Sequence, residues 1–170
     1  MYPYEALASK YPHINILYRV MPTHLPGLNV NDDIYISEHE TNVRKYEVLQ
    51  EEIAHYETTV GNIVAGDTKD KRKQEKKARS IAMERAVPLD DLIYCYFNDI
   101  WTPEDIADYC NVEVKYLYKA IDNYRTKYGP VFRYKDYLID MRNSINIKEV
   151  KKWKSVLCVV WRLELWTLVV

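Results

Sequence analysis

The amino-acid sequence predicts an α+β fold in which a small sheet is followed by a long series of helices. Two short runs rich in β-branched and aromatic residues, 14–20 and 34–37, indicate strands. From residue 42 the apolar residues recur with a helical period. The chain has 4 Gly among 170 residues, which argues against an all-β fold with many glycine turns.

The N-terminal elements are expected in this order. Residues 4–10 form a short helix, 14–20 a strand, 21–33 a loop rich in Pro, Gly, Asn and Asp, and 34–37 a second strand. A long helix then starts at Thr41 or Asn42, either of which can cap it.

The remaining elements are helical. A second long helix runs to about Ala86, with Asp67 or Thr68 as its cap, and Pro88 ends it. Further helical segments continue to Gly129 and Pro130. We therefore divide the chain into a core at 1–90, a helical segment at 91–130 and a C-terminal extension at 131–170.

Composition excludes several classes of protein. Hydrophobic residues make up 48% and charged residues 29%, as in globular proteins. A net charge of -1 gives no overall attraction to nucleic acid or anionic membranes. Three cysteines without C-x-x-C spacing and an N-terminus without a signal-peptide pattern predict a cytoplasmic protein.

The C-terminal stretch 153–170 is more apolar than the rest of the chain. Lys154, Arg162 and Glu164 interrupt it, so it lacks the run of about 20 apolar residues that spans a bilayer. We expect a buried strand or a packing tail there and assign it no function.

The sequence Glu51-Glu52-Ile53-Ala54-His55 differs by one residue from the metalloprotease motif H-E-x-x-H. On a helix, Glu51 and His55 lie on one face and can bind one ion, with Glu52 beside them as a general base. A surface helix that carries Glu and His by chance is the competing interpretation, because the motif alone is weak.

The second long helix supplies another carboxylate. Glu75 precedes Ala78 and Ala82 at helical spacing, on the small apolar face that we expect to pack against a partner helix. A carboxylate on such a face needs a partner. Either a metal ion bound by His55 or the guanidinium of Arg79, one turn further on, can serve.

Taken together, the two motifs resemble the ImmA/IrrE family of zinc-dependent endopeptidases over about residues 1–130. The pieces that match are "VLQEEIAHYETTVGNI" and "KQEKKARSIAMERAVP", the second with the pattern Q-E-x-x-A. The resemblance implies a zincin-like core, a small sheet packed on metal-binding helices, followed by a helix-turn-helix-like segment. It makes His55 and Glu75 metal ligands and Glu52 the general base, and the family's first His ligand falls on Glu51.

With Glu51 as a ligand, one His and two Glu would bind the ion, so the ligand charge of -2 would cancel a divalent cation. A less positive centre acidifies a water less strongly. Zinc is the expected metal, and a ligand set with two carboxylates also suits manganese or iron.

Residues 100–126 have the pattern of a helix-turn-helix, with Thr102 as a cap and Asn111 in the turn. The second helix carries charges of both signs, which favours a structural or substrate-docking role over DNA binding. The basic run 69–79 is interpreted as a solvated helix face or as a patch that orients an acidic part of a protein substrate.

Three functions follow, in order of preference. The first is a metallopeptidase whose substrate, as the resemblance implies, is a helix-turn-helix repressor of a prophage or mobile element, cleaved to derepress its genes. The second is a non-catalytic protein that keeps the fold and binds a regulator. The third is a small DNA-binding regulator built on residues 100–126. Oligomeric state is left open.

Overall fold

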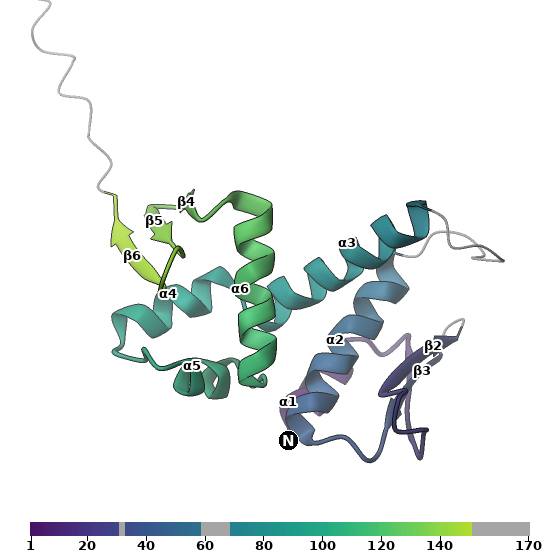
Figure 1. The fold of residues 1–170 in the computed structure, drawn as a ribbon. Helices are drawn as coiled ribbons and strands as arrows, with labels where there is room; N and C mark the ends of the chain where they lie inside the picture. The colour runs from purple at the N-terminus through teal and green to yellow at the C-terminus, as the bar shows by residue number, and fades with distance from the viewer. Residues whose placement is uncertain (31–32, 59–68, 151–170) are drawn as a thin grey trace, which may run out of the picture.

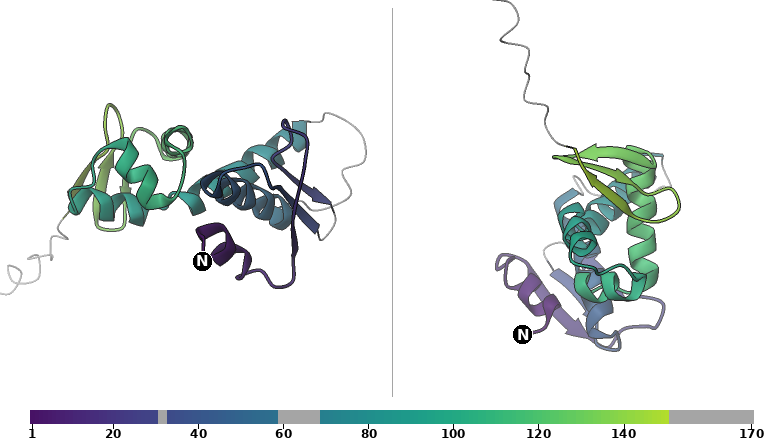
Figure 2. Two further views of the ribbon diagram at one scale, coloured as in Figure 1. Left: turned by 90° about the horizontal axis from the view of Figure 1, so that it is seen from below. Right: turned by 90° about the vertical axis from the view of Figure 1, so that its left-hand side faces the viewer.

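The computed structural model describes residues 1–30, 33–58 and 69–150, and they form two lobes (Figures 1 and 2). The predicted cap at Asp67 or Thr68 and the apolar stretch 153–170 lie outside the described residues. In the described part of the chain, no helix is long and apolar enough to cross a membrane.

The first lobe is a three-stranded sheet packed on helices. Its elements in chain order are α1 (Pro3–Ala8), β1 (Asn15–Arg19), β2 (Gly27–Val30), β3 (Asp33–Ser37), α2 (Asn42–Thr58) and α3 (Lys69–Ala86). The strand order is β1-β3-β2, with β1 parallel and β2 antiparallel to β3. Buried aliphatic residues of α1, β3 and α2, with Ile14 just before β1, form the core between sheet and helix: Leu7, Ile14, Ile34, Ile36, Val48, Leu49 and Ile53.

The α+β prediction is confirmed, and one N-terminal element differs from expectation. Strand β2 lies inside the stretch predicted as a loop. Gly and Asn at positions 27 and 29 have low strand propensity, so local sequence gave no strand signal. Its antiparallel register with β3, from Gly27 opposite Ile36 to Val30 opposite Asp33, makes it a strand.

Helices α2 and α3 pack closely because small residues meet between them. Ala54, Ala78 and Ala82 are fully buried in one cluster, as the predicted small apolar face of α3 required. At the start of α2 the Thr41 hydroxyl accepts a hydrogen bond from the Arg44 amide at 3.1 Å, so Thr41 is the cap.

The second lobe packs three helices against an antiparallel sheet. Its elements are α4 (Leu89–Phe97), α5 (Pro103–Cys110), α6 (Val114–Tyr128), β4 (Val131–Tyr134), β5 (Tyr137–Asp140) and β6 (Asn146–Glu149), with strand order β4-β5-β6. Residues from α4, α5 and α6 share one core with Ile139, Met141 and Ile147 of the sheet region. Packing therefore continues across residue 130.

Helices α5 and α6 are joined as the helix-turn-helix pattern predicts. The Thr102 hydroxyl accepts a hydrogen bond from the Asp105 amide at 3.1 Å and caps α5. Asn111 takes a left-handed conformation with φ of 54° in the turn, which asparagine tolerates better than most residues.

Buried polar contacts join the two lobes. The fully buried Glu47 of α2 accepts a hydrogen bond from the Glu113 amide at the start of α6, at 2.7 Å. Its other oxygen pairs with Arg44 at 2.6 Å. Further along α6, the Tyr124 hydroxyl donates to the Val87 carbonyl oxygen at 2.8 Å. These contacts hold α6 beside the two helices of the predicted metal site.

Candidate metal centre

Helix α2 presents the three predicted residues Glu51, Glu52 and His55. It is continuous from Asn42 to Thr58, so Glu51 and His55 lie one turn apart as expected. The side chains of His55 and Glu51 are both partly buried.

Packing of α3 on α2 brings the fourth predicted residue to His55. The Nε2 atom of His55 lies 3.6 Å from one carboxylate oxygen of Glu75. The other oxygen of Glu75 lies 2.7 Å from the Arg79 guanidinium. Glu75 therefore contacts both Arg79, one of its two expected partners, and His55, the residue expected to bind a metal ion beside it.

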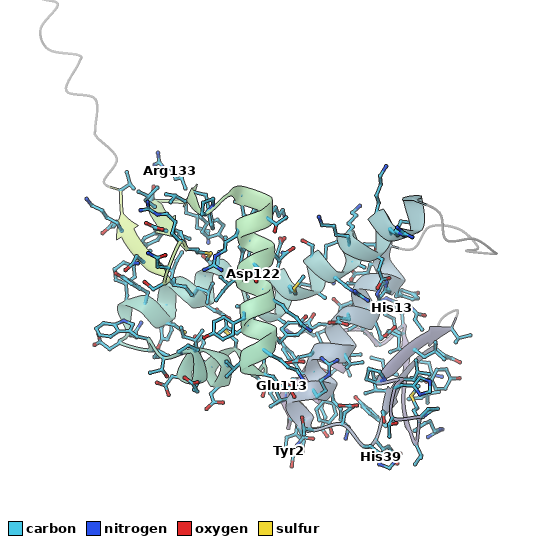
Figure 3. All side chains as sticks on the ribbon, in the orientation of Figure 1. Tyr2, His13, His39, Glu113, Asp122 and Arg133 are labelled. Atoms are coloured by element: carbon cyan, nitrogen blue, oxygen red, sulfur yellow. The ribbon has the colours of Figure 1, made fainter. Side chains whose placement is uncertain are left out.

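A cleft of about 800 Å³ lies between these helices and α6. Glu51 and Glu75 both line it, with Asp122 on the α6 wall (Figure 3). Five cations also line it: Arg44, Arg72, Lys76, Arg79 and Lys119. The cleft is therefore more basic than acidic, and part of the basic run 69–79 borders it.

Glu52 lies on the sheet side of α2. A Cβ atom added at Gly27 of β2 would stand 2.9 Å from a Glu52 carboxylate oxygen and 2.4 Å from Val48, so glycine permits this close approach. The Asn29 amide donates to the Glu52 carbonyl oxygen at 3.5 Å. Burial, together with the charges of Glu51 and Glu75, raises the pKa of Glu52 to about 7.

The donor chemistry suits a divalent ion, but the side chains are not drawn together into a full ligand set. Among the described residues, no group of three or more His, Cys, Asp or Glu side chains is arranged to hold a metal. His55 and Glu75 are close enough to act as a pair, and Glu51 faces the same cleft. One imidazole and two carboxylates are donors that Zn²⁺, Mn²⁺ and Fe²⁺ accept. The residues present therefore fit such an ion in kind, with His55 and Glu75 as the pair already in place.

Sequence reasoning missed three features of the site. Gly27 carried a signal, since a glycine between strand-like residues often marks a close backbone approach. Asn29 carried none. Tyr116 of α6 also lines the cleft, and its buried hydroxyl lacks a hydrogen-bond partner among the described residues. Nothing distinguished it from the other tyrosines, of which the chain has 16 in all.

Of the remaining histidines, His39 lies far from His55 along α2, whereas His13 lies near Tyr56, the neighbour of His55. His39 is exposed in the turn before α2 (Figure 3). From the start of α2 to His55 the helix rises about 20 Å, at 1.5 Å per residue. His13 is exposed and its ring is 6.3 Å from that of Tyr56.

Comparison with known proteins gives one match. A family of peptidases, described as the IrrE N-terminal-like domain, matches residues 7–122, more than half of the chain. The matched segment contains all four predicted site residues and extends into α6. No curated protein and no solved structure matches significantly.

Proposed function

The chain belongs to the IrrE N-terminal-like family of peptidases, and from this premise we propose that it is a metal-dependent endopeptidase acting on a protein substrate. The family supports a metallopeptidase-like function and implies a divalent metal. The observation that carries the proposal for this chain is the approach of His55 to Glu75, two residues from different helices, at 3.6 Å.

In this proposal His55, Glu75 and Glu51 hold the ion, with zinc as the first candidate and manganese or iron as alternatives. A bound ion would polarise the scissile carbonyl group and acidify a water molecule. Support for Glu51 is its place on the lining of the same cleft as Glu75. Metal binding requires Glu75 to exchange its contact with Arg79 for the ion, at least in part.

Glu52 is assigned as the general base that takes a proton from water and returns it to the leaving amine. It follows Glu51 directly on α2, and Gly27 leaves room for its carboxylate against β2. That strand lies at an edge of the sheet order β1-β3-β2, where an extended peptide can add main-chain hydrogen bonds. Such a peptide would run past Glu52.

The proposed substrate is a helix-turn-helix repressor of a prophage or mobile element, whose cleavage would release the genes it controls. The assignment of a repressor as the substrate rests on the family resemblance. The basic lining of the cleft supports a substrate segment that carries acidic residues, because a local field of one sign attracts the opposite charge.

The first test is the metal content of the purified protein by elemental mass spectrometry. We expect about one ion per chain, lost in His55→Ala and in Glu75→Ala. His39→Ala and Glu38→Ala are the matched controls, since both residues are exposed and lie at the other end of α2. Equal metal content in all five proteins would contradict the site, and a chain without metal after reconstitution would contradict the proposal.

The second test separates chemistry from metal binding. Glu52→Gln keeps the size of the side chain and removes the base, so cleavage of a repressor should fall by about 100-fold or more while metal content is unchanged. A variant that cleaves at the normal rate would exclude Glu52 as the base.

Two observations favour the alternative of a non-catalytic regulator-binding protein. A carboxylate replaces the first imidazole of the motif, and Arg79 already pairs with Glu75 at 2.7 Å. For that function, repressor binding would persist in His55→Ala and no cleavage would occur in any variant.

A further inference from the structure

The side chain of Tyr116, in the first turn of α6, carries a buried hydroxyl group that the proposed function does not use. Tyr116 is 1% exposed, and its ring packs in the core of the second lobe. The same residue lines the cleft between α2, α3 and α6. Its hydroxyl forms no hydrogen bond with any described residue. A buried hydroxyl without a partner destabilises a fold, so we looked for an acceptor beside it.

The contact between α2 and the start of α6 brings Tyr116 toward Glu51. Glu47, one turn before Glu51 on α2, accepts a hydrogen bond from the Glu113 amide at 2.7 Å. Tyr116 lies three residues after Glu113, and both helices run upward from this contact in Figure 1. Residues three or four apart share one face of a helix. The faces that meet at Glu47 and Glu113 therefore continue to Glu51 and Tyr116, and both of these residues line the cleft.

Of the two carboxylates on this face of α2, Glu51 is the one that can accept another hydrogen bond. One oxygen of Glu47 is bound by the Glu113 amide and the other by Arg44. The carboxylate of Glu51 forms no ion pair in the described part of the chain. Burial raises the pKa of Tyr116, and among the neighbouring charges that of Glu51 raises it most. The phenol therefore keeps its proton and is a donor.

We propose that Tyr116 is a positioning residue for Glu51. Its hydroxyl donates a hydrogen bond to one carboxylate oxygen of Glu51, and the other oxygen stays available for the metal ion. The ring of Tyr116 is fixed in the core, whereas the partly buried Glu51 can change rotamer, so Glu51 moves to make the contact. Hydrogen bonds from neighbouring residues orient the ligands of metal sites in this way. The inference rests on the proposed function, in which Glu51 is a ligand.

This role gives the second lobe a part in the metal centre. The proposed ligands Glu51, His55 and Glu75 all belong to the first lobe, and Tyr116 reaches the centre from α6. A carboxylate has two oxygens that can bind an ion, and a hydrogen bond to one of them restricts the ion to the other. Tyr116 would thus fix the carboxylate that stands where the H-e-x-x-H motif has its first imidazole.

The first measurement is the Kd of the metal-free full chain for Zn²⁺ and for Mn²⁺, by competition with a chelator. Tyr116→Phe keeps the ring and removes only the hydroxyl, so the Kd should rise about tenfold or more. Tyr118→Phe removes an exposed hydroxyl from the same helix and should leave the Kd within about twofold. Tyr124→Phe removes a buried hydroxyl that donates to the Val87 carbonyl oxygen, and it should also leave the Kd within about twofold.

A double-mutant cycle tests whether Tyr116 acts through Glu51. Glu51→Ala should itself weaken metal binding, and adding Tyr116→Phe should change the Kd by less than about twofold further. The same four proteins are then unfolded by urea with a chelator present. Tyr116→Phe alone should lower the equilibrium constant for folding about fivefold or more. In the Glu51→Ala background it should leave that constant equal or higher, because the hydroxyl has already lost its acceptor.

Three results would overturn the inference: an unchanged Kd in Tyr116→Phe, an equal loss of affinity in Tyr116→Phe and Tyr124→Phe, or an equal effect of Tyr116→Phe with and without Glu51. A wild-type chain that bound no metal would contradict the proposed function. The urea cycle would still decide whether Tyr116 holds Glu51, because it is measured without metal. Failure of the metal site and failure of the hydrogen bond are therefore distinguished.

Discussion

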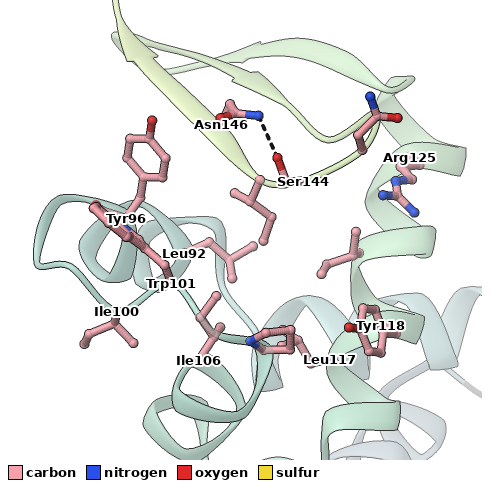
Figure 4. Close-up of a pocket in the computed structure, with 14 residues that line it drawn as sticks. Leu92, Tyr96, Ile100, Trp101, Ile106, Leu117, Tyr118, Arg125, Ser144 and Asn146 are labelled. Atoms are coloured by element: carbon pink, nitrogen blue, oxygen red, sulfur yellow. Dashed lines mark hydrogen bonds between the residues drawn. The ribbon is translucent and has the colours of Figure 1, made fainter.

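Two hollows of the molecule, one between the lobes and one within the second lobe, differ in chemistry. The cleft between α2, α3 and α6 is lined by three carboxylates and five cations. The pocket of the second lobe is lined mainly by aliphatic and aromatic side chains, with Arg125, Asn143, Ser144 and Asn146 as its polar lining residues (Figure 4). The first arrangement suits chemistry on a polar bond, and the second suits the burial of apolar side chains.

Two arginine–carboxylate pairs with three-residue spacing differ in another respect, the burial of the carboxylate. Arg44 and Glu47 pair at 2.6 Å with the carboxylate fully buried. Arg125 and Asp122 pair at 2.7 Å with the carboxylate 69% exposed. Sequence spacing and distance are nearly equal, so their energetic roles are separated by the burial of Glu47 and by the second hydrogen bond that it accepts from the Glu113 amide.

The largest effect is expected from Glu47→Ala. It leaves the Arg44 charge partly buried and the Glu113 amide without its acceptor, so the free energy of unfolding should fall by about 3–5 kcal/mol. Asp122→Ala should cost less than about 1 kcal/mol, because water replaces an exposed partner. Urea unfolding of both variants measures the difference. Equal losses would mean that the buried pair does not hold the lobes together.

An intermediate effect concerns Glu52 in the metal-free protein. Its pKa of about 7 exceeds the ordinary value of 4.5, so the folded state binds a proton more tightly than the unfolded state. Stability from this residue is therefore highest below pH 4.5 and is lost as pH rises through about 7.

The substitution Glu52→Gln removes the loss of stability that accompanies ionisation of Glu52. With a chelator present, the variant should exceed the wild type in stability by about 1–3 kcal/mol at pH 8, and the difference should shrink toward pH 5. Thermal unfolding of both proteins at several pH values tests this, and a Glu52→Gln variant that is less stable at pH 8 would contradict the prediction.

The smallest effect is expected from Arg79→Gln. The Arg79–Glu75 pair is exposed, so its removal should change stability by less than about 1 kcal/mol. It should also tighten metal binding by at most about fivefold, since Glu75 no longer divides its charge between two partners. Arg142→Gln breaks an exposed pair in the second lobe and should leave metal affinity unchanged. Weaker metal binding in Arg79→Gln would indicate that Arg79 orients Glu75 for the ion.

Much of the fold follows from local patterns. The helical period predicted α2 and α3, and β-branched runs predicted β1 and β3. Thr102 and Asn111 fit the ends of α5 because caps and left-handed turns depend on a few adjacent residues. Strand β2 was missed because pairing with β3, and not its own composition, makes it a strand.

For the candidate site too, some relations follow from local sequence and others depend on tertiary packing. The spacing of Glu51, Glu52 and His55 is a property of one helix, so the sequence alone predicted their common region. The contact between His55 and Glu75 joins two helices, and the sequence could only suggest it through the small residues around Ala78. The ligand role of Glu51 stays a prediction.

By itself, then, the sequence determined the α+β class, the helix that carries the motif and the family, because each depends on residue types at fixed short spacings. Only the tertiary structure decided that Glu75 divides its carboxylate between His55 and Arg79, that Gly27 brings β2 against Glu52, and that Trp101 borders an apolar pocket. Those relations depend on how distant segments pack, and packing places atoms within a few tenths of an ångström, which no residue spacing specifies.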